Sequence, residues 1–195
     1  MVQKLNSETE ITVILINYNQ SKYLEDAIKS VLNQSYNNYE LIIIDNGSVD
    51  NSKKIIETFL GDNRINYLNY NKNDAVTKRL NHAISIAKGK YINFLMADDM
   101  IEKNKLNSQL NMFKKLDDDY GIVYGLSIVI NENNKKNYLA DVVKINSNAL
   151  SEQLKKNLIN GHINFNSALI KKKCLIDYPM LETIFIETES IFLCF

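Results

Sequence analysis

The sequence has no excess of charge, few cysteines and no long apolar segment, and each absence excludes a class of protein. Its 195 residues carry 23 basic and 23 acidic side chains, whereas a general nucleic-acid binder usually has a basic excess. No apolar run reaches the ~18 residues of a membrane-spanning helix, and the polar stretch from Met1 to Glu10 does not resemble a signal peptide. Cys174 and Cys194 are too few for a secreted disulfide framework. These absences predict a cytoplasmic protein with no transmembrane segment and no nucleic-acid partner.

Several familiar catalytic and cofactor motifs are missing as well. The chain has no G-x-G-x-x-G at the start of its first expected helix, no P-loop and no G-x-S-x-G elbow. Dinucleotide-cofactor and P-loop chemistry are therefore not indicated. His82 and His162 are isolated and the cysteines are distant, so these residues form no zinc-binding set.

What is present is an ordinary globular composition and a regular alternation of strands and helices. Apolar residues make up 45% of the chain and charged residues 24%, and this length favours one domain. Short apolar runs predict buried strands over 11–16, 41–44, 65–68 and 91–96, and apolar residues at helical spacing predict helices over 24–32, 52–60, 75–87 and 103–116. We expect Ser21 to cap the first helix and Gly89 to close the third. The alternation implies a parallel sheet with right-handed crossovers.

The pattern changes after the acidic run 117–119. Strands over 121–130 and 138–145 are expected to form a hairpin, followed by a helix near 147–158, an extended segment 168–170 and a terminal helix. The run Lys171 to Lys173 is interpreted as a solvated face, with contact to a phosphorylated or membrane-borne acceptor as the alternative. We therefore predict one α/β domain, in which helices flank a mostly parallel central sheet and a small antiparallel addition forms the second half.

Polar side chains follow the first, second and fourth expected strands. They are Asn17, Tyr18 and Asn19, then Asp45, Asn46, Gly47 and Ser48, and finally Asp98 and Asp99. In open parallel sheets, ligands bind beyond the carboxyl ends of the strands. Each group taken alone is also consistent with a turn or a helix cap. Together they favour a site for hydrogen-bonding groups and a hard divalent cation.

The order and spacing of these motifs resemble the family 2 glycosyltransferases, which have the GT-A fold. The similar stretches are Val13 to Asn19 (VILINYN), Tyr23 to Tyr36, Glu40 to Asp50 (ELIIIDNGSVD), Leu80-Asn81, Ala87 to Ile92 and Phe94 to Asp99 (FLMADD). The resemblance covers roughly residues 10–101 and resumes weakly at 166–172. It implies a nucleotide-sugar-binding half over about 10–101 and an acceptor-side half over about 120–195.

The resemblance also implies roles for individual residues. Residues 17–19, Asp45, Asn46, Arg79 and Asp98 would bind the nucleotide-sugar, a UDP-sugar above others. Tyr18 would flank the base, Asp45 would hydrogen-bond it, and Arg79 would contact the ribose or diphosphate. Asp98 and Asp99 would bind Mn²⁺ or Mg²⁺ beside the diphosphate. The implied reaction is inverting, with a carboxylate that deprotonates the acceptor hydroxyl.

Three residues depart from the family's pattern. Asn46 stands in place of an aspartate, and Met96 replaces the first aspartate of D-x-D, where a thioether is a poor ligand for a hard cation. Thr188 occupies the position of the usual catalytic base, which leaves Glu187 and Glu189 as the candidate bases. Equally, both glutamates are consistent with ordinary charges on an amphipathic helix.

The leading hypothesis is a bacterial glycosyltransferase that acts on a glycan or lipid-linked acceptor in surface polysaccharide synthesis, at the inner face of the membrane with a peripheral association. The alternative is a degenerate relative that binds a nucleotide or a partner enzyme without catalysis. A flavodoxin-like regulatory domain fits less well, because of the antiparallel second half and the F-L-x-A-D-D stretch. The uncapped apolar run 191–195 leads us to expect a truncated chain, with a naturally short protein as the alternative, and an exposed apolar terminal face.

Overall fold

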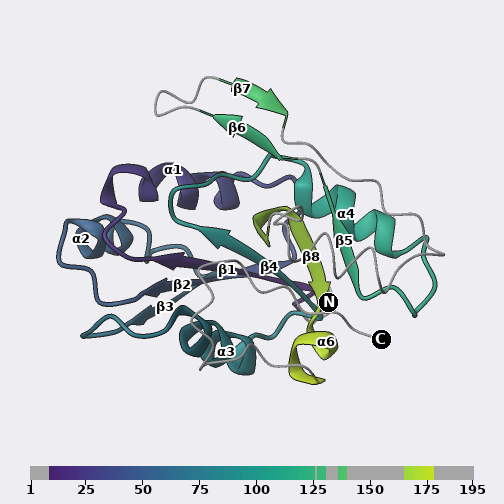
Figure 1. Cartoon of the computed structure of the whole chain (residues 1–195), viewed down its shortest axis with the longest axis horizontal. Helices are drawn as coiled ribbons and strands as arrows, with labels where there is room; N and C mark the ends of the chain where they lie inside the picture. Colours follow the sequence, from purple (N-terminus) through teal and green to yellow (C-terminus); the bar gives the residue numbers. More distant parts are fainter. Residues whose placement is uncertain (1–8, 126, 131–135, 140–164, 178–195) are drawn as a thin grey trace, which may run out of the picture.

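The computed structural model describes residues 9–125, 127–130, 136–139 and 165–177, and these form a six-stranded sheet with helices on both faces (Figure 1). The strands are β1 (Ile11–Asn17), β2 (Tyr39–Asp45), β3 (Ile65–Asn69), β4 (Tyr91–Met96), β5 (Ile122–Tyr124) and β8 (Ala168–Lys171), in the spatial order β3-β2-β1-β4-β8-β5. The first four strands are parallel, and β8 runs antiparallel to both β4 and β5. The predicted mostly parallel sheet is confirmed.

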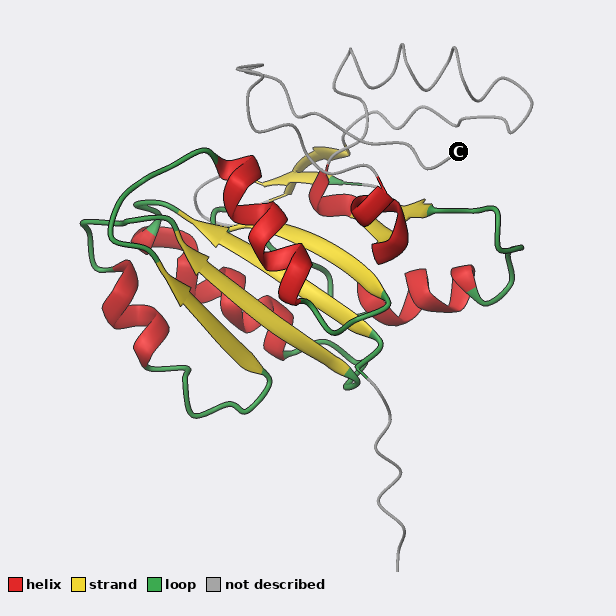
Figure 2. Cartoon of the chain, turned by 90° about the horizontal axis from the view of Figure 1, so that it is seen from below, coloured by secondary structure: helices red, strands yellow, loops and turns green. Residues whose placement is uncertain are grey.

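The helices cover the two faces of this sheet. They are α1 (Ser21–Leu32), α2 (Ser52–Glu57), α3 (Val76–Ile86), α4 (Lys105–Phe113), the 3₁₀ helix η2 (Phe165–Ser167) and α6 (Lys172–Asp177). Side chains of α1, α2 and α4 pack on one face, and those of α3 and α6 pack on the other. Figure 2 shows the strands side by side between these helical layers. The four helices expected in the first half of the sequence are present; α1 begins three residues earlier than the expected range 24–32, and α2, α3 and α4 are slightly shorter than the pattern indicated.

The continuous apolar strands exist because both faces of the sheet are covered. Along β1, Val13 and Leu15 point into the core beneath α1, whereas Ile14 and Ile16 point into the core beneath α3. All seven residues of β1 and of β2 are buried. A parallel strand buried on both faces needs apolar residues at nearly every position.

The prediction of a single strand over 121–130 is wrong. Residues 122–124 join the main sheet as β5, whereas β6 (Ile128–Ile130) pairs with β7 (Lys136–Leu139) in a separate antiparallel hairpin. The hairpin itself was expected, but β7 begins two residues earlier than the predicted strand at 138. The break follows from tertiary pairing, since β5 has its partner in β8, more than forty residues away along the chain. The expected helices near 147–158 and after 177 lie outside the described residues.

Ser21 and Gly89 do not cap helices in the way that the sequence predicted. Ser21 is the first helical residue of α1 rather than its cap, and its N–H donates to Asp50 Oδ2 at 2.9 Å. Gly89 does not have a positive φ. A Cβ at Gly89 would lie 2.4 Å from the backbone nitrogen of Thr12, so the glycine permits a close approach to β1 rather than a left-handed helix end.

The interpretation of the whole lysine run 171–173 as a solvated face is also wrong. Lys171 is buried, and its Nζ donates to the carbonyl oxygen of Asp118 at 2.7 Å, whereas Lys173 is exposed. Among the residues that the structure describes, no helix is long and apolar enough to cross a membrane.

Candidate functional site

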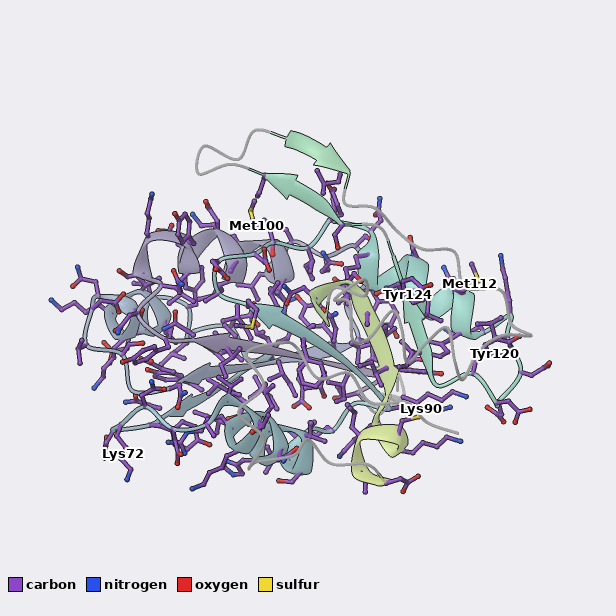
Figure 3. All side chains as sticks on the ribbon, in the orientation of Figure 1. Lys72, Lys90, Met100, Met112, Tyr120 and Tyr124 are labelled. Atoms are coloured by element: carbon purple, nitrogen blue, oxygen red, sulfur yellow. The ribbon has the colours of Figure 1, made fainter. Side chains whose placement is uncertain are left out.

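The register of the sheet brings the predicted polar residues to one edge. Asn17, the last residue of β1, lies opposite Asp45 at the end of β2, and Ile16 lies opposite Met96 at the end of β4. Lys72, in the loop after β3, lies at this end of the molecule, and Lys90, just before β4, lies at the opposite end (Figure 3). The carboxyl ends of β1, β2 and β4 therefore share one edge, as expected from the sequence.

The loops that follow β1 and β2 are joined through Ser48. Asn17 Nδ2 and the backbone N–H of Asn19 each donate to Ser48 Oγ at 3.0 Å, and Val49 N–H donates to Asn19 Oδ1 at 2.9 Å. Asn19 has a φ of 54°, a left-handed conformation that asparagine tolerates better than most residues. Ser48 N–H donates in turn to Asp45 Oδ1 at 3.0 Å. These contacts fix the floor of the site from both loops.

Asn17 and Asp45 are buried at this floor, and Tyr18 extends from it. Asn17 and Asp45 are each 1% exposed, whereas Tyr18 is 44% exposed. Asn17 Oδ1 has no hydrogen-bond partner in the structure. A buried acceptor without a partner is rare in folded proteins and requires an explanation, such as a ligand or a water that completes it.

Asn46 connects the end of β2 to the loop that precedes α3. Its Nδ2 donates to Asn73 Oδ1 at 2.7 Å and to the carbonyl of Asp74 at 2.8 Å, and its Oδ1 accepts from Asp74 N–H and from Arg79 Nε at 2.9 Å. These four hydrogen bonds use the full capacity of a primary amide. A carboxylate at this position has no N–H to donate to Asn73 or Asp74, so this loop is built around the asparagine.

Arg79 is almost fully buried beneath the same loop. It is 8% exposed, its Nη2 donates to the carbonyl of Lys72 at 3.1 Å, and its guanidinium lies 3.6 Å from the centre of the Tyr70 ring. Asp74 Oδ2 lies 3.7 Å from Nη2. The Tyr70 hydroxyl contacts His82 Nδ1 on α3. Stacking on an aromatic ring and a fixed fork of donors are the properties that distinguish arginine from lysine at an anion site.

Asp98 and Asp99 follow β4 and differ in their surroundings. Asp98 is exposed, whereas Asp99 is partly buried and accepts a hydrogen bond from Asn166 Nδ2. Asn166 Oδ1 also accepts from the N–H of Met96 at 3.0 Å. Asn166 therefore ties the end of β4 to the segment that leads into β8. Met96 is 38% exposed at the position where the family resemblance expects an aspartate.

The oxygen atoms of Asp98 and Asp99 suit a hard divalent cation. Mg²⁺ is typically held by one or two carboxylates together with substrate phosphates and water. Within the described ranges, no three side chains of His, Cys, Asp or Glu come close enough together to hold a metal ion without such help. The two carboxylates therefore fit a cation that arrives with a diphosphate, and the thioether of Met96 adds no ligand for it.

The structure does not describe the candidate bases, and it gives roles in the site to two residues, Ser48 and Asn166. Glu187 and Glu189 lie outside the described residues, as does Thr188, so the role of the two glutamates as candidate bases stays a prediction, and so does the exposed terminal face. Ser48 and Asn166 received no role from the sequence. Ser48 belongs to the D-N-G-S motif that signalled the site, but the contact of Asn166 with Asp99 joins positions 67 residues apart, and no local pattern indicates it.

Comparisons with known proteins agree with this geometry. The family model described as Glycosyl transferase family 2 matches residues 12–178. Glycosyltransferase GlyG of Streptococcus pneumoniae is 34% identical over 110 residues, which cover 56% of this chain and 36% of GlyG. TuaG of Bacillus subtilis, a glycosyltransferase named for teichuronic acid biosynthesis, is 37% identical over 101 residues, 51% of this chain and 40% of TuaG. The chain thus spans less than half the length of either relative.

Two solved structures have the same fold at low sequence identity. TarS of S. aureus, in complex with UDP-GlcNAc, superposes with a TM-score of 0.67 at 18% identity, over 86% of this chain and 47% of TarS. The mannosyltransferase PcManGT of Pyrobaculum calidifontis, in complex with GDP-Man and Mn²⁺, gives 0.62 at 15% identity, over 88% of this chain and 47% of PcManGT. The expected GT-A fold is confirmed.

Proposed function

Because the chain belongs to glycosyl transferase family 2, we propose that it binds a nucleotide-sugar at the shared edge of β1, β2 and β4 and transfers the sugar to a hydroxyl of a glycan or lipid-linked acceptor. The observation that carries this proposal is the convergence of Asn17, Asp45 and Asp98 at the carboxyl ends of three parallel strands. Ligands of open α/β sheets bind at this place. The complexes of TarS with UDP-GlcNAc and of PcManGT with GDP-Man support a nucleotide-sugar donor.

Each part of the site has a task in this proposal. Tyr18, exposed above the floor, flanks the nucleobase, and Asp45 and the unpartnered Oδ1 of Asn17 offer acceptors to its N–H groups. Arg79, held by Asn46 and Tyr70, supplies a fixed positive charge beside the nucleotide. A positioned guanidinium contributes by stabilising charge without reorganising during the reaction.

Asp98 and Asp99 hold the divalent cation, Mn²⁺ or Mg²⁺, and Asn166 orients Asp99. When bound, the cation stabilises negative charge on the departing diphosphate. The proposed mechanism is inverting, with Glu187 or Glu189 removing the proton of the acceptor hydroxyl. TuaG, by its name, supports a role in the synthesis of a bacterial surface polysaccharide. The cytoplasmic location and the peripheral membrane association remain predictions.

The alternative proposal is a degenerate relative that binds a nucleotide without transferring sugar. Met96 is the observation that favours it, since a thioether stands where the D-x-D pattern has an aspartate. Asn46 does not favour it in the same way, because its amide is fully used in holding the loop before α3. Both proposals predict that the chain binds a nucleotide, but only the first predicts turnover of the nucleotide-sugar.

The test is hydrolysis of the donor by the purified protein, measured as release of nucleoside diphosphate from UDP- and GDP-sugars in the presence of Mn²⁺. Transfer predicts metal-dependent release that is lost in Asp98→Asn and retained in Asp119→Asn, a matched change at an exposed aspartate away from the site. Binding of the nucleotide with no release would support the degenerate relative. If neither UDP nor GDP binds, both proposals are wrong.

A further inference from the structure

A pocket of about 460 Å³ lies next to Asp99, on the side of the molecule that carries the β6–β7 hairpin. Its lining comes from Ser30 of α1, the loop after β4, the first turns of α4, residues 125, 127, 128 and 130, and Asn166 with Ser167. Met100, which belongs to this lining, lies between α1 and the hairpin (Figure 3). The volume is within the range of small-molecule sites, ~300–1,000 Å³. We call it the hairpin pocket.

The wall of the hairpin pocket combines apolar side chains with polar and charged ones. Met100, Ile128 and Ile130 supply apolar surface of the kind found in small-molecule sites. Asp99 and Asn166, the hydrogen-bonded pair of the candidate donor site, form part of the same wall. The hairpin pocket is therefore continuous with the place where the transferred sugar is expected.

Lys105, in the first turn of α4, is held in this wall by Gln109. Gln109 is 6% exposed, and its Nε2 donates to the carbonyl oxygens of Ser167 at 2.7 Å and Val123 at 3.2 Å. With both amide hydrogens used, the Gln109 carbonyl is left as an acceptor, and Lys105 Nζ donates to it at 2.9 Å. This arrangement fixes one of the three N–H bonds of the ammonium group and leaves the other two for a ligand.

No carboxylate neutralises Lys105 in the part of the chain that the structure describes. The other charged groups of the lining are Asp99, Glu102 and Lys103; Asp99 is hydrogen-bonded to Asn166, and Glu102 and Lys103 are exposed. Because no opposite charge offsets its burial, the pKa of Lys105 falls to about 7. A lysine in a pocket without a counter-charge gains the most from a ligand that supplies one.

We propose that the hairpin pocket receives the acceptor, and that the acceptor carries an anionic group, a phosphate or a carboxylate, which binds the ammonium group of Lys105. This inference rests on the proposed function, because it assigns the second substrate of the same site. The anionic group then lies at the first turn of α4, in the pocket that Asp99 also lines. An uncharged acceptor leaves the two remaining N–H bonds of Lys105 without a charged partner.

The test compares charged and uncharged acceptor fragments in NMR titrations of the purified protein with UDP and Mg²⁺ bound. Methyl glucuronoside is compared with methyl glucoside, which has the same ring without the carboxylate, and glycerophosphoglycerol with diglycerol. We expect at least one charged fragment to bind about tenfold more tightly than its uncharged counterpart, which corresponds to ~1.4 kcal/mol. The fragment that shows the preference identifies the anion as a carboxylate or a phosphodiester.

Three variants and a pH series complete the test. Lys105→Met removes the preference without affecting UDP affinity, whereas Lys103→Met, a matched change at an exposed lysine of the same wall, keeps it. Gln109→Glu, which replaces the neutral partner of Lys105 by a carboxylate, weakens the preference for the charged fragment. In the wild type, the affinity for methyl glucuronoside falls as the pH rises from about 6 to about 8.5, because Lys105 loses its proton while the carboxylate stays ionised. In Lys105→Met the affinity does not change with pH over this range.

Equal affinities for charged and uncharged fragments overturn the proposal, as does an equal loss of preference in Lys103→Met. A loss of UDP affinity in Lys105→Met overturns it too, since Lys105 then belongs to the donor site. A wild type that binds neither UDP nor, when it is used in place of UDP, GDP instead contradicts the proposed function. The two failures are therefore distinguishable in one set of titrations.

Discussion

At the scale of single residues, Asn46 determines the position of the loop before α3. In Asn46→Asp, the new carboxylate gains charge attraction to Arg79 but faces Asn73 Oδ1 and the Asp74 carbonyl with no N–H to donate. The two lost hydrogen bonds are each worth about 0.5–1.5 kcal/mol, which makes ~1–3 kcal/mol together. We expect the free energy of unfolding in urea to fall by about that amount. Asn71→Asp, at an exposed residue of the same loop, is expected to change it little, and an equal fall in both variants contradicts the role of Asn46.

Gly47, the next residue, has a φ of 81° and lies against the same loop. A Cβ at this position would come within 2.4 Å of the carbonyl carbon of Lys72 and 2.5 Å of the nitrogen of Asn73. In Gly47→Ala, the left-handed conformation alone costs ~1–2 kcal/mol, and the contact with backbone atoms adds to it. Gly61→Ala is the control, because a Cβ there meets nothing within 4 Å. In thermal unfolding, we expect the melting temperature to fall strongly in Gly47→Ala and to change little in Gly61→Ala. Similar melting temperatures for the two variants contradict the prediction.

At the scale of secondary-structure elements, Asp50 joins the starts of two helices. Its Oδ2 accepts from Ser21 N–H at the start of α1, and its Oδ1 accepts from Ser52 N–H at the start of α2, both at 2.9 Å. Burial raises the pKa of Asp50, but the hydrogen bonds from Ser52 and Ser21 outweigh it and lower the pKa to about 2. One carboxylate therefore caps two helices on the same face of the sheet.

Because the pKa of Asp50 is lower in the folded state than in the unfolded chain, its contribution to stability is present above the unfolded value and is lost as the pH falls. Asp50→Ala is expected to cost ~1–2 kcal/mol at neutral pH, the usual range for a lost helix cap. The difference in the free energy of unfolding between wild type and variant should shrink as the pH falls from about 4 to about 2. Urea unfolding at several pH values measures it, and a difference that does not depend on pH contradicts the prediction.

The elements that the sequence predicted correctly are those whose signals are local. The apolar runs of β1 and β2 and the helical spacing of α1 need no knowledge of the rest of the chain. The prediction failed where a distant segment decides the outcome. The strand over 121–130 is divided because β5 pairs with β8, and Ser21 is not a cap because Asp50 takes that role from another loop.

At the scale of the whole molecule, Asn166 connects the two parts of the sequence that resemble the family. It bonds both Asp99 and the N–H of Met96, so the late segment positions the carboxylate that follows β4. Removing a group that orients a metal ligand typically lowers metal affinity ~10–100-fold. We expect Asn166→Ala to weaken Mn²⁺-dependent UDP binding by about that factor. Asn111→Ala, on the exposed side of α4, should leave it unchanged, and an unaffected Asn166→Ala contradicts the assigned role.

In the site too, the residues predicted correctly have local sequence signals, whereas the contacts that were missed join distant segments. Asn17, Asp45 and Asp98 follow the expected strands of a parallel sheet, so we expected them to meet at its carboxyl end. The engagement of Asn46 with Asn73 and Asp74, and the hold of Gln109 on Lys105, arise from loops and helices that meet only in the folded chain. Periodicity carries no information about such contacts.

The central claim is that the edge of β1, β2 and β4 binds a nucleotide together with a divalent cation. Isothermal titration of UDP and GDP into the purified protein, with and without Mn²⁺, tests it most directly. We predict that one of the two nucleotides binds at least about tenfold more tightly with Mn²⁺, and that Asp98→Asn removes this gain whereas Asp119→Asn keeps it. Equal affinity with and without Mn²⁺, or no binding of either nucleotide, would contradict the claim.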